Sequence, residues 1–358
     1  PRKIAQGSIG DIRPCVYCYT CVSAIYTRER MRCAVNAECG FEYQRVARKT
    51  TASKKRVAVV GGGPGGMEAA RRLASDGHEV VLFEKSDRLG GTLRFASLAY
   101  AANERLLDWL CLQVEAHDIE VRLKTSATPD LIKALQPDAV VVATGALRSL
   151  PSIPGCELPH VFSGDDMRDL VLGSGTERLK TKTSAFTRLA TRLGSSTGLS
   201  ANLDFVRKAT HTWMPLGTNI VIIGGELVGI ELAEFLCERG RKVTVVDDAP
   251  RFGAGLTLVR RLRILAELRE HGVGLYPGSK DIRIEPGQVG FTDNTGAVLT
   301  VSADQVIVAR GATGDSSQAE ALRAAGLRVH EGGDGTDVGY IEGAMRDAMA
   351  AADAIGAD

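Results

Sequence analysis

Five of the eight cysteines in this 358-residue chain lie before residue 40. Cys15, Cys18 and Cys21 follow one another at three-residue steps, and Cys33 comes after eleven further residues. Three thiolates on one loop with a fourth nearby favour an iron–sulfur cluster, with Cys15, Cys18, Cys21 and Cys33 as metal ligands. Zinc is an alternative, although a tetrahedral zinc site more often uses two separated CxxC pairs. Plain buried cysteines are a third interpretation, and the one that we hold for Cys39.

A glycine-rich stretch from Arg56 to Gly91 predicts a second site. Gly61, Gly63 and Gly66 give the GxGxxG spacing of a strand-to-helix turn, which holds a pyrophosphate at the start of the helix. Glu84 ends the next strand, where its carboxylate can accept hydrogen bonds from a ribose. A glycine-rich turn in an ordinary α/β protein is the weaker alternative, because all the elements occur in order. They are a strand at 57–60, a helix at 67–75 and a strand at 79–83.

Three further segments favour FAD as the dinucleotide. The EKS and LGG residues that follow the second strand are one of them. A strand at 139–142 then runs into an Ala-Thr-Gly turn, and a Gly-Asp pair precedes a helix at 343–355 near the end of the chain. The predicted FAD site comprises Gly61, Gly63, Pro64, Gly66, Glu84, Lys85, Gly91, Thr92, Ala143, Thr144, Gly145, Asp334, Tyr340 and Ile341.

A second, nested dinucleotide unit begins with a strand at 219–223. Its glycine turn departs from the pattern, because Glu226 occupies the position of the middle glycine. A carboxylate there takes the space of a pyrophosphate and repels its charge, so we expect a degraded or shifted site. Asp247 ends the next strand and favours NADH over NADPH, whereas Arg251 could reverse that preference. The predicted NADH site comprises Gly224, Gly225, Glu226, Gly229 and Asp247.

Composition narrows the class of protein. The formal net charge of +1 argues against a nucleic-acid partner or an anionic membrane partner. No apolar run approaches the roughly 18 residues that span a bilayer. The N-terminal segment lacks the apolar core of a signal peptide, so we expect a cytoplasmic protein.

The elements that position these residues form an α/β fold with two nested Rossmann-like domains and an N-terminal Cys-rich segment. The expected domains are the Cys-rich segment and linker at 1–53, the FAD domain at 54–164 plus 305–358, and the NADH-binding-like domain at 165–304. A strand at 305–309 is expected to return the chain to the FAD domain. The basic segment at 167–212 is interpreted as a partly helical solvated insertion, with a mobile lid and a docking surface as alternatives.

Read in order, these motifs resemble the C-terminal half of iron–sulfur flavoproteins of the old yellow enzyme type. The motifs are IRPCxxCxxC, a fourth cysteine, KKRVAVVGGGPGGMEAA, FEKSDRLGG, an ATG strand and a nested second Rossmann unit. That group includes 2,4-dienoyl-CoA reductase, enoate reductases, bile-acid enone reductases and trimethylamine dehydrogenase. Its members carry a TIM barrel with FMN and the substrate site before this segment, and this chain begins about where that barrel should end. The resemblance therefore implies a barrel as a partner subunit or as part of the same polypeptide, in an assembly that we expect to be oligomeric.

The resemblance implies an electron path from NADH through FAD and a 4Fe-4S cluster to FMN in the barrel, which reduces an activated C=C bond. No catalytic residue is identifiable in this chain, because the expected chemistry belongs to the flavins. An amine-dehydrogenase arrangement with reversed electron flow and vestigial nucleotide sites is an alternative, and a non-catalytic assembly subunit is another. A disulfide reductase is disfavoured, because Thr92-Leu-Arg-Phe follows the LGG motif without a redox cysteine.

Overall fold

The computed structural model describes residues 2–43, 53–148, 150–172, 179, 182–183 and 202–357. Most of the expected linker before residue 53, and most of the basic insertion, lie outside the described residues. The chain divides into two compact units. The first contains Pro1–Ser97, Ala101–Leu147 and Ala312–Asp358, and the second contains Leu98–Tyr100 and Arg148–Gly311.

The first unit is built on a parallel five-stranded sheet in the order β15-β4-β1-β2-β3. Its register pairs Val60 with both Phe83 and Val142, so the residues after these strands emerge at one edge of the sheet. Gly61, Glu84 and Ala143 are therefore brought to the same edge. The strands are β1 (Arg56–Val60), β2 (Glu79–Phe83), β3 (Glu120–Arg122), β4 (Ala139–Val142) and β15 (Val329–Glu331).

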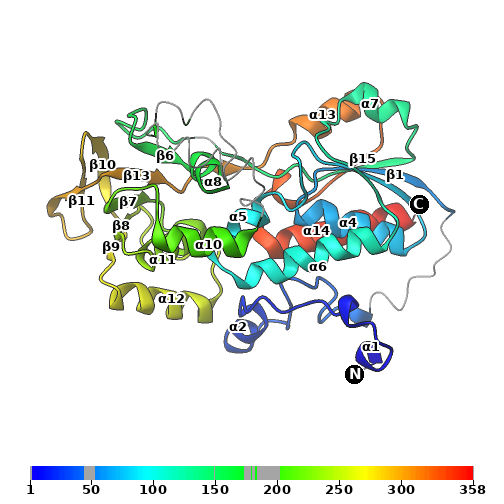
Figure 1. Cartoon of the computed structure of the whole chain (residues 1–358), viewed down its shortest axis with the longest axis horizontal. Helices are drawn as coiled ribbons and strands as arrows, with labels where there is room; N and C mark the ends of the chain where they lie inside the picture. Colours follow the sequence, from blue (N-terminus) through cyan, green and yellow to red (C-terminus); the bar gives the residue numbers. More distant parts are fainter. Residues whose placement is uncertain are drawn as a thin grey trace. The chain divides into compact units, whose positions relative to one another are not determined.

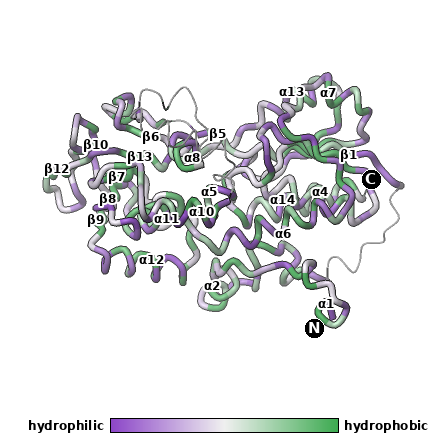
Figure 2. Tube along the Cα trace, in the orientation of Figure 1, coloured by the Kyte–Doolittle hydropathy of each residue, from purple (hydrophilic) through white to green (hydrophobic). Residues whose placement is uncertain are grey.

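Helices cover both faces of this sheet (Figure 1). One face packs in a buried cluster with Ile132 of α7 and with Ala319 and Leu322 of α13, and α4, α6 and α14 lie on the other face. Figure 2 draws the strands around β1 in green, the colour of hydrophobic residues, which agrees with this buried position. The helices are α4 (Pro64–Ser75), α5 (Thr92–Ala99), α6 (Ala102–Ala116), α7 (Pro129–Ala134), α13 (Ser317–Ala324), η4 (Gly333–Gly335) and α14 (Tyr340–Ala357).

The cysteine-rich head, residues 2–43, belongs to the same unit. It contains α1 (Arg2–Ala5), η1 (Ile9–Asp11) and α2 (Thr20–Thr27), and no strand longer than a single bridge occurs in it. Contacts with α6 and α14 attach the head. Gln113 donates a hydrogen bond to the carbonyl of Gly10, and Arg32 pairs with Glu342 at 2.7 Å.

The second unit repeats this plan with the strand order β6-β13-β7-β8-β9, again parallel. An antiparallel sheet in the order β10-β11-β12 covers one face, where Val289 and Phe291 join the buried core. The parallel strands are β6 (Val161–Ser163), β7 (Asn219–Ile223), β8 (Lys242–Val246), β9 (Gly274–Tyr276) and β13 (Gln305–Val308). The antiparallel strands are β10 (Lys280–Glu285), β11 (Gln288–Thr292) and β12 (Val298–Ser302). The helices are α8 (Gly164–Leu172), α10 (Leu203–Thr212), α11 (Leu227–Cys237) and α12 (Leu258–Glu270). Two short strands, β5 (Leu147–Arg148) and β14 (Ala312–Thr313), form a separate pair.

The predicted α/β class with two Rossmann-like units is confirmed, but two strands are placed differently. The sequence assigned 161–163 and 305–308 to the FAD domain, and the structure corrects both assignments. β13 lies between β6 and β7 in the second sheet. It pairs with the backbone N–H and C=O groups along one edge of β7, which would otherwise be unpaired, as β4 does for β1 in the first sheet. The chain therefore leaves the first unit near residue 147 and returns near residue 312. Among the described residues, no helix is both long enough and apolar enough to cross a membrane.

Candidate cofactor sites

The first glycine turn, Gly61–Gly66, has the geometry of a dinucleotide-binding turn. Gly61 has φ +107°, and a Cβ atom added to it would lie 2.3 Å from the carbonyl oxygen of Ala143. A Cβ atom on Gly66 would lie 1.8 Å from the carbonyl oxygen of Gly61. Both positions therefore require glycine to keep the fold. A Cβ atom on Gly63 would meet nothing within 4 Å, so the space over the middle glycine is open.

Helix α4 begins directly at this turn. Gly63 is its N-cap residue, Pro64 is its first residue, and no side chain caps it. The first amides of such a helix and its positive dipole end can bind an anionic group. The helix expected from the sequence begins later, at Met67, so the structure extends it by three residues at its start. The proline, whose fixed φ suits the first helical position, was the missed signal.

Glu84 fixes the turn from the adjacent strand. Its carboxylate accepts a hydrogen bond from Gly62 N–H at 2.7 Å and another from Ser86 N–H at 2.7 Å. The side chain is only 7% exposed, so both acceptor bonds lie in a buried setting. Glu84 therefore stands at the predicted ribose position with its carboxylate already oriented by the backbone.

The other predicted FAD segments converge on the same turn. A Cβ atom on Gly91 would lie 3.1 Å from the Cα atom of Gly63, and one on Gly65 would lie 3.8 Å from the Cα atom of Gly333. Thr92 begins helix α5 beside Gly91, and Thr144 and Gly145 follow Ala143 at the edge of the sheet. Lys85 is exposed and directly follows Glu84. Three segments, at 84–92, 143–145 and 333–341, thus meet around Gly61–Gly66 although they are separated in the sequence.

Asp334 organises the start of the C-terminal helix. Its Oδ1 atom accepts hydrogen bonds from Gly339 N–H at 2.9 Å and Tyr340 N–H at 3.1 Å. Tyr340 has φ +55°, a left-handed conformation that is uncommon for a residue other than glycine. Ile341 follows it in the first turn of α14. The carboxylate therefore contacts the backbone of one predicted FAD residue, Tyr340, which has this left-handed conformation.

The second glycine turn has the same backbone framework. Gly224 has φ +124°, and a Cβ atom on Gly229 would lie 1.9 Å from the carbonyl oxygen of Gly224. Glu226 takes the N-cap position of α11, and its side chain is exposed. The first amide of the helix, Leu227 N–H, already donates to the carbonyl of Ala254 at 2.8 Å. This turn therefore offers an anion fewer free amides than a bare helix start would.

Asp247 follows β8 in the second unit, as Glu84 follows β2 in the first, and is 2% exposed. It accepts hydrogen bonds from Gly225 N–H and from Ala249 N–H, the latter at 2.9 Å. Arg310 also pairs with Asp247 and with Asp248. Arg251 as the residue that could reverse the preference for NADH stays a prediction, and Arg310 is a further cation at this site. Arg310 follows β13 as Thr144 follows β4 in the first unit, and this equivalence is the sequence feature that indicates its place near Asp247.

Two of the predicted cluster ligands, Cys15 and Cys18, lie on a tightly turned loop of the head, whereas Cys21 lies in α2 and Cys33 forms a bridge with Asn36. Tyr17 and Tyr19 have φ values of 53° and 61°, and these left-handed residues alternate with the cysteines. Tyr17 N–H approaches the Cys15 sulfur at 3.4 Å. Such amide–sulfur contacts suit a thiolate that ligates a cluster.

Burial raises the pKa of the Cys33 thiol, although backbone amides of Val35 and Asn36 oppose that effect by stabilising the thiolate. Cys33 interacts electrostatically with Cys18 and with Cys39, and Cys39 interacts with Cys21. Across the part of the chain that is described, no three His, Cys, Asp or Glu side chains are gathered in a metal-binding group. The thiols thus share one region without forming a closed ligand set.

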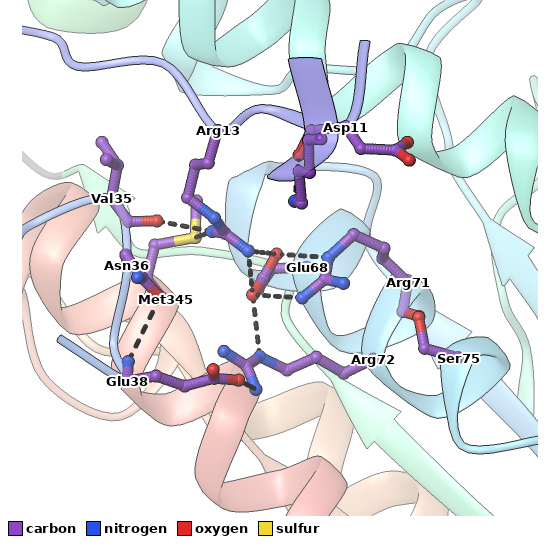
Figure 3. Close-up of polar contacts among 11 residues, drawn as sticks. Asp11, Arg13, Val35, Asn36, Glu38, Glu68, Arg71, Arg72, Ser75 and Met345 are labelled. Carbon is purple, nitrogen blue, oxygen red and sulfur yellow. Dashed lines mark hydrogen bonds and ion pairs between the residues drawn. The ribbon is translucent and has the colours of Figure 1, made fainter. Parts of the chain in front are cut away.

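A buried charge network, which sequence reasoning missed, joins the head to α4 (Figure 3). Glu68 is fully buried and accepts hydrogen bonds from Arg13 at 2.9 and 3.1 Å, from Arg71 at 2.9 Å and from Arg72 at 2.7 Å. Arg72 also pairs with Glu38 at 2.8 Å. The spacing of Glu68, Arg71 and Arg72 at i, i+3 and i+4 on one helix was the available signal.

The charges of this network hold Glu68 ionised. Burial alone would raise the pKa of its carboxyl group. The hydrogen bonds from Arg71 and the charges of Arg13, Arg71 and Arg72 outweigh burial and lower the pKa of Glu68 to about 2.

Curated relatives agree with the predicted resemblance. The chain is 32% identical to a bilirubin reductase of Mediterraneibacter gnavus over 93% of this chain and 46% of that protein. It is 30% identical to an NADH oxidase of Thermoanaerobacter brockii over 95% of this chain and 47% of that protein. The chain therefore spans about half the length of the curated relatives it matches. The solved complex of 2-naphthoyl-CoA reductase with 2-naphthoyl-CoA superposes with a TM-score of 0.79 at 27% identity, over 97% of this chain and 47% of that one.

A family model extends this agreement to most of the chain. The model described as pyridine nucleotide-disulphide oxidoreductase matches residues 55–340, which include both glycine turns. FAD- and NAD-type dinucleotide-binding units and oxidoreductase activity are the features that such relatives share. The chain belongs to the pyridine nucleotide-disulphide oxidoreductase family.

Proposed function

We propose that this chain is the electron-transfer module of a flavin and iron–sulfur oxidoreductase. In this proposal the first unit holds FAD at the Gly61–Gly66 turn and a 4Fe-4S cluster on the head. The second unit receives NADH, and an FMN-containing barrel, on the same polypeptide or on a partner subunit, reduces an activated C=C bond. A cytoplasmic location and an oligomeric assembly are parts of the same proposal.

The convergence of three segments on the first glycine turn is the main support for this proposal. The fold requires glycine at positions 61 and 66, because a Cβ atom there would clash with the backbone, whereas the space over Gly63 is open. Glu84 orients its carboxylate beside that space, and Asp334 holds the backbone of Tyr340. The arrangement fits a pyrophosphate over Gly63 and a ribose at Glu84, as a bound FAD would require.

The donor set of the head fits a cluster. Cys15, Cys18, Cys21 and Cys33 would ligate the irons, and amides of Tyr17, Val35 and Asn36 would surround the sulfurs. When bound, FAD and a cluster together convert an electron pair into single electrons. The chain itself contributes the ligands, the amides near the sulfurs and the burial that set the cluster potential.

The FMN barrel is proposed because the curated relatives are about twice as long as this chain. The bilirubin reductase and the 2-naphthoyl-CoA reductase are named for reductive reactions, which favours electron flow from a nicotinamide nucleotide toward a substrate. The substrate residues would belong to the barrel.

A second candidate is the amine-dehydrogenase arrangement, in which electrons flow in the opposite direction, the nucleotide sites are vestigial and ADP can take the place of FAD in the first unit. One observation favours it. Glu226 takes the N-cap position of α11 that Gly63 takes in α4, so a carboxylate would face a pyrophosphate bound there. The two candidates differ in whether NADH reduces the protein.

The test is cofactor analysis of anaerobically purified chain. Heat-released nucleotide should be FAD rather than ADP, iron should accompany it, and NADH should drive reduction of an artificial acceptor. Iron with ADP in place of FAD, or FAD and iron without NADH oxidation, would select the second candidate. Background levels of flavin, ADP and iron together would refute both.

A further inference from the structure

We propose that Glu68 is a positioning residue that clamps the cysteine-bearing loops of the head onto the helix of the FAD turn. The inference rests on the proposed function, in which the head holds the cluster and α4 faces the flavin nucleotide. It deepens that function, because it assigns the device that sets the separation of the two sites to named residues.

The clamp reaches both ends of the cysteine segment. Arg13 lies two residues before Cys15, and it donates to the carbonyl of Val35, two residues after Cys33, as well as to Glu68. Glu38, next to Cys39, is held by Arg72. The first and last predicted ligands are therefore each within two residues of a contact in this network.

The body of the clamp belongs to elements of the FAD unit. Glu68, Arg71 and Arg72 all lie on α4, which starts at Gly63. Arg13 also stacks over the Trp109 ring of α6 with 4.2 Å to its centroid, and its Nη1 atom lies 3.9 Å from the sulfur of Met345 on α14. Figure 3 shows the Arg13 and Arg71 side chains directed at the Glu68 carboxylate, with Met345 beside Arg13. One guanidinium thus contacts three helices of this unit.

Burial makes the clamp stiff. The side chains of Arg13, Glu68, Arg71 and Arg72 are exposed by 15%, 0%, 14% and 7%. Breaking a buried ion pair by removing one partner is strongly destabilising, whereas an exposed pair contributes little. The exposed Arg32–Glu342 pair also attaches the head, and it is accordingly the weaker attachment.

The rate of electron transfer between two cofactors falls steeply as the distance between them grows. A head that is fixed on α4 keeps the thiols of Cys15 and Cys33 at a constant distance from the Gly61–Gly66 turn. A head that is free to move would still bind iron but would pass electrons more slowly. The clamp therefore acts on the rate of transfer rather than on the ligands themselves.

The experiment compares Arg13→Gln and Glu68→Gln with wild type and with the matched control Glu79→Gln. Glu79 pairs with Arg56 at the surface of the same unit, where its side chain is 46% exposed. Arg13→Gln leaves Glu68 paired with Arg71 and Arg72, so α4 retains its own charge partners. If Glu68→Gln fails to fold, Arg13→Gln alone decides the outcome.

The first readout is amide hydrogen exchange of chains prepared without iron. Head amides at 13–38 should exchange about a hundredfold faster in Arg13→Gln, while amides of β1 and β2 stay unchanged. Glu79→Gln should match wild type throughout. Equal exchange of the head in wild type and Arg13→Gln would overturn the clamp, whether or not the chain carries cofactors.

The second readout is the rate at which the reduced cluster appears after NADH is mixed with cofactor-loaded protein. In Arg13→Gln this rate should fall at least about tenfold at unchanged FAD and iron content. An unchanged rate would overturn the positioning role. Wild type without iron or flavin would instead refute the proposed function, and the exchange readout would still report on the clamp.

Discussion

Gly63 and Glu226 begin their helices with nearly the same backbone conformation. Gly63 has φ −74° and ψ −178°, and Glu226 has φ −78° and ψ −176°. Neither angle lies in the left-handed region, so the backbone does not demand glycine at either position. The difference between the two turns is therefore one of space and charge, at the place where a pyrophosphate would lie.

A glutamate at position 63, the residue type that the second turn has at position 226, should abolish FAD binding without unfolding the protein. We expect Gly63→Glu to lose bound FAD, because the carboxylate would fill the open space and repel the pyrophosphate. The unfolding free energy of the apoprotein should change by less than about 1 kcal/mol. Cofactor content and urea unfolding check both statements.

Gly66→Ala is the contrasting variant. Its Cβ atom would lie 1.8 Å from the carbonyl oxygen of Gly61, so the apoprotein itself should be destabilised. Equal loss of stability in Gly63→Glu and Gly66→Ala would contradict a ligand-binding role for the space over Gly63.

The reverse change, a glycine at position 226, should raise the affinity of the second turn for NADH. Glu226→Gly removes a carboxylate whose repulsion by a pyrophosphate is worth about 1 kcal/mol for each pair of unit charges 4 Å apart in water. We expect NADH to bind at least about tenfold more tightly. Isothermal titration of NADH against wild type and Glu226→Gly measures the change.

Glu238→Gln provides the control for Glu226→Gly, because it removes one negative charge from the opposite end of α11. Its NADH affinity should remain that of wild type. If Glu226→Gly also leaves the affinity unchanged, Glu226 is not what limits this turn.

The clamp predicts a specific response to acid. The pKa of Glu68 is about 2 in the folded protein, compared with about 4.3 in an unfolded chain. A depressed pKa stabilises the fold fully above the unfolded value, and that contribution is lost as the pH falls toward 2. It amounts to roughly 3 kcal/mol. The stability difference between wild type and Glu68→Gln should therefore shrink between about pH 4.5 and pH 2.

Urea unfolding at a series of pH values measures this difference, with Glu79→Gln as the exposed counterpart. A difference between wild type and Glu68→Gln that stays constant from neutral pH to about pH 2.5 would show that the Glu68 charge does not stabilise the fold.

The ligand set predicts a contrast between two cysteines. Cys33→Ser should lose most of the iron, and Cys39→Ser should retain it, when both are purified anaerobically. Cys39 interacts electrostatically with both Cys21 and Cys33, so its place beside the cluster is testable. Iron loss in Cys39→Ser but not in Cys33→Ser would make Cys39 the fourth ligand.

Much of the nucleotide-binding framework follows from local sequence. The strands at 79–83, 139–142 and 219–223 have the bounds that the sequence predicted, because apolar runs flanked by turns define them. The glycine turn at Gly61 is equally readable, since a positive φ and a close carbonyl leave no other residue type. These features depend on neighbours in the chain.

The features that the sequence did not predict depend on long-range placement. β13 joins the second sheet rather than the first. The sequence of a short apolar strand does not indicate which of two sheets it will join. Arg13 finds Glu68 across 55 residues, and Arg310 finds Asp247 across 63. Charged side chains are usually solvated, so only the fold shows which of them are buried together.

The most direct test of the central claim is an anaerobic titration of the cofactor-loaded chain with NADH, followed by both optical and electron paramagnetic resonance spectra. The proposal predicts that the flavin absorbance bleaches and that the signal of a reduced iron–sulfur cluster then appears in the same sample. A flavin that stays oxidised in excess NADH, with a cluster that only a chemical reductant can reduce, would contradict it.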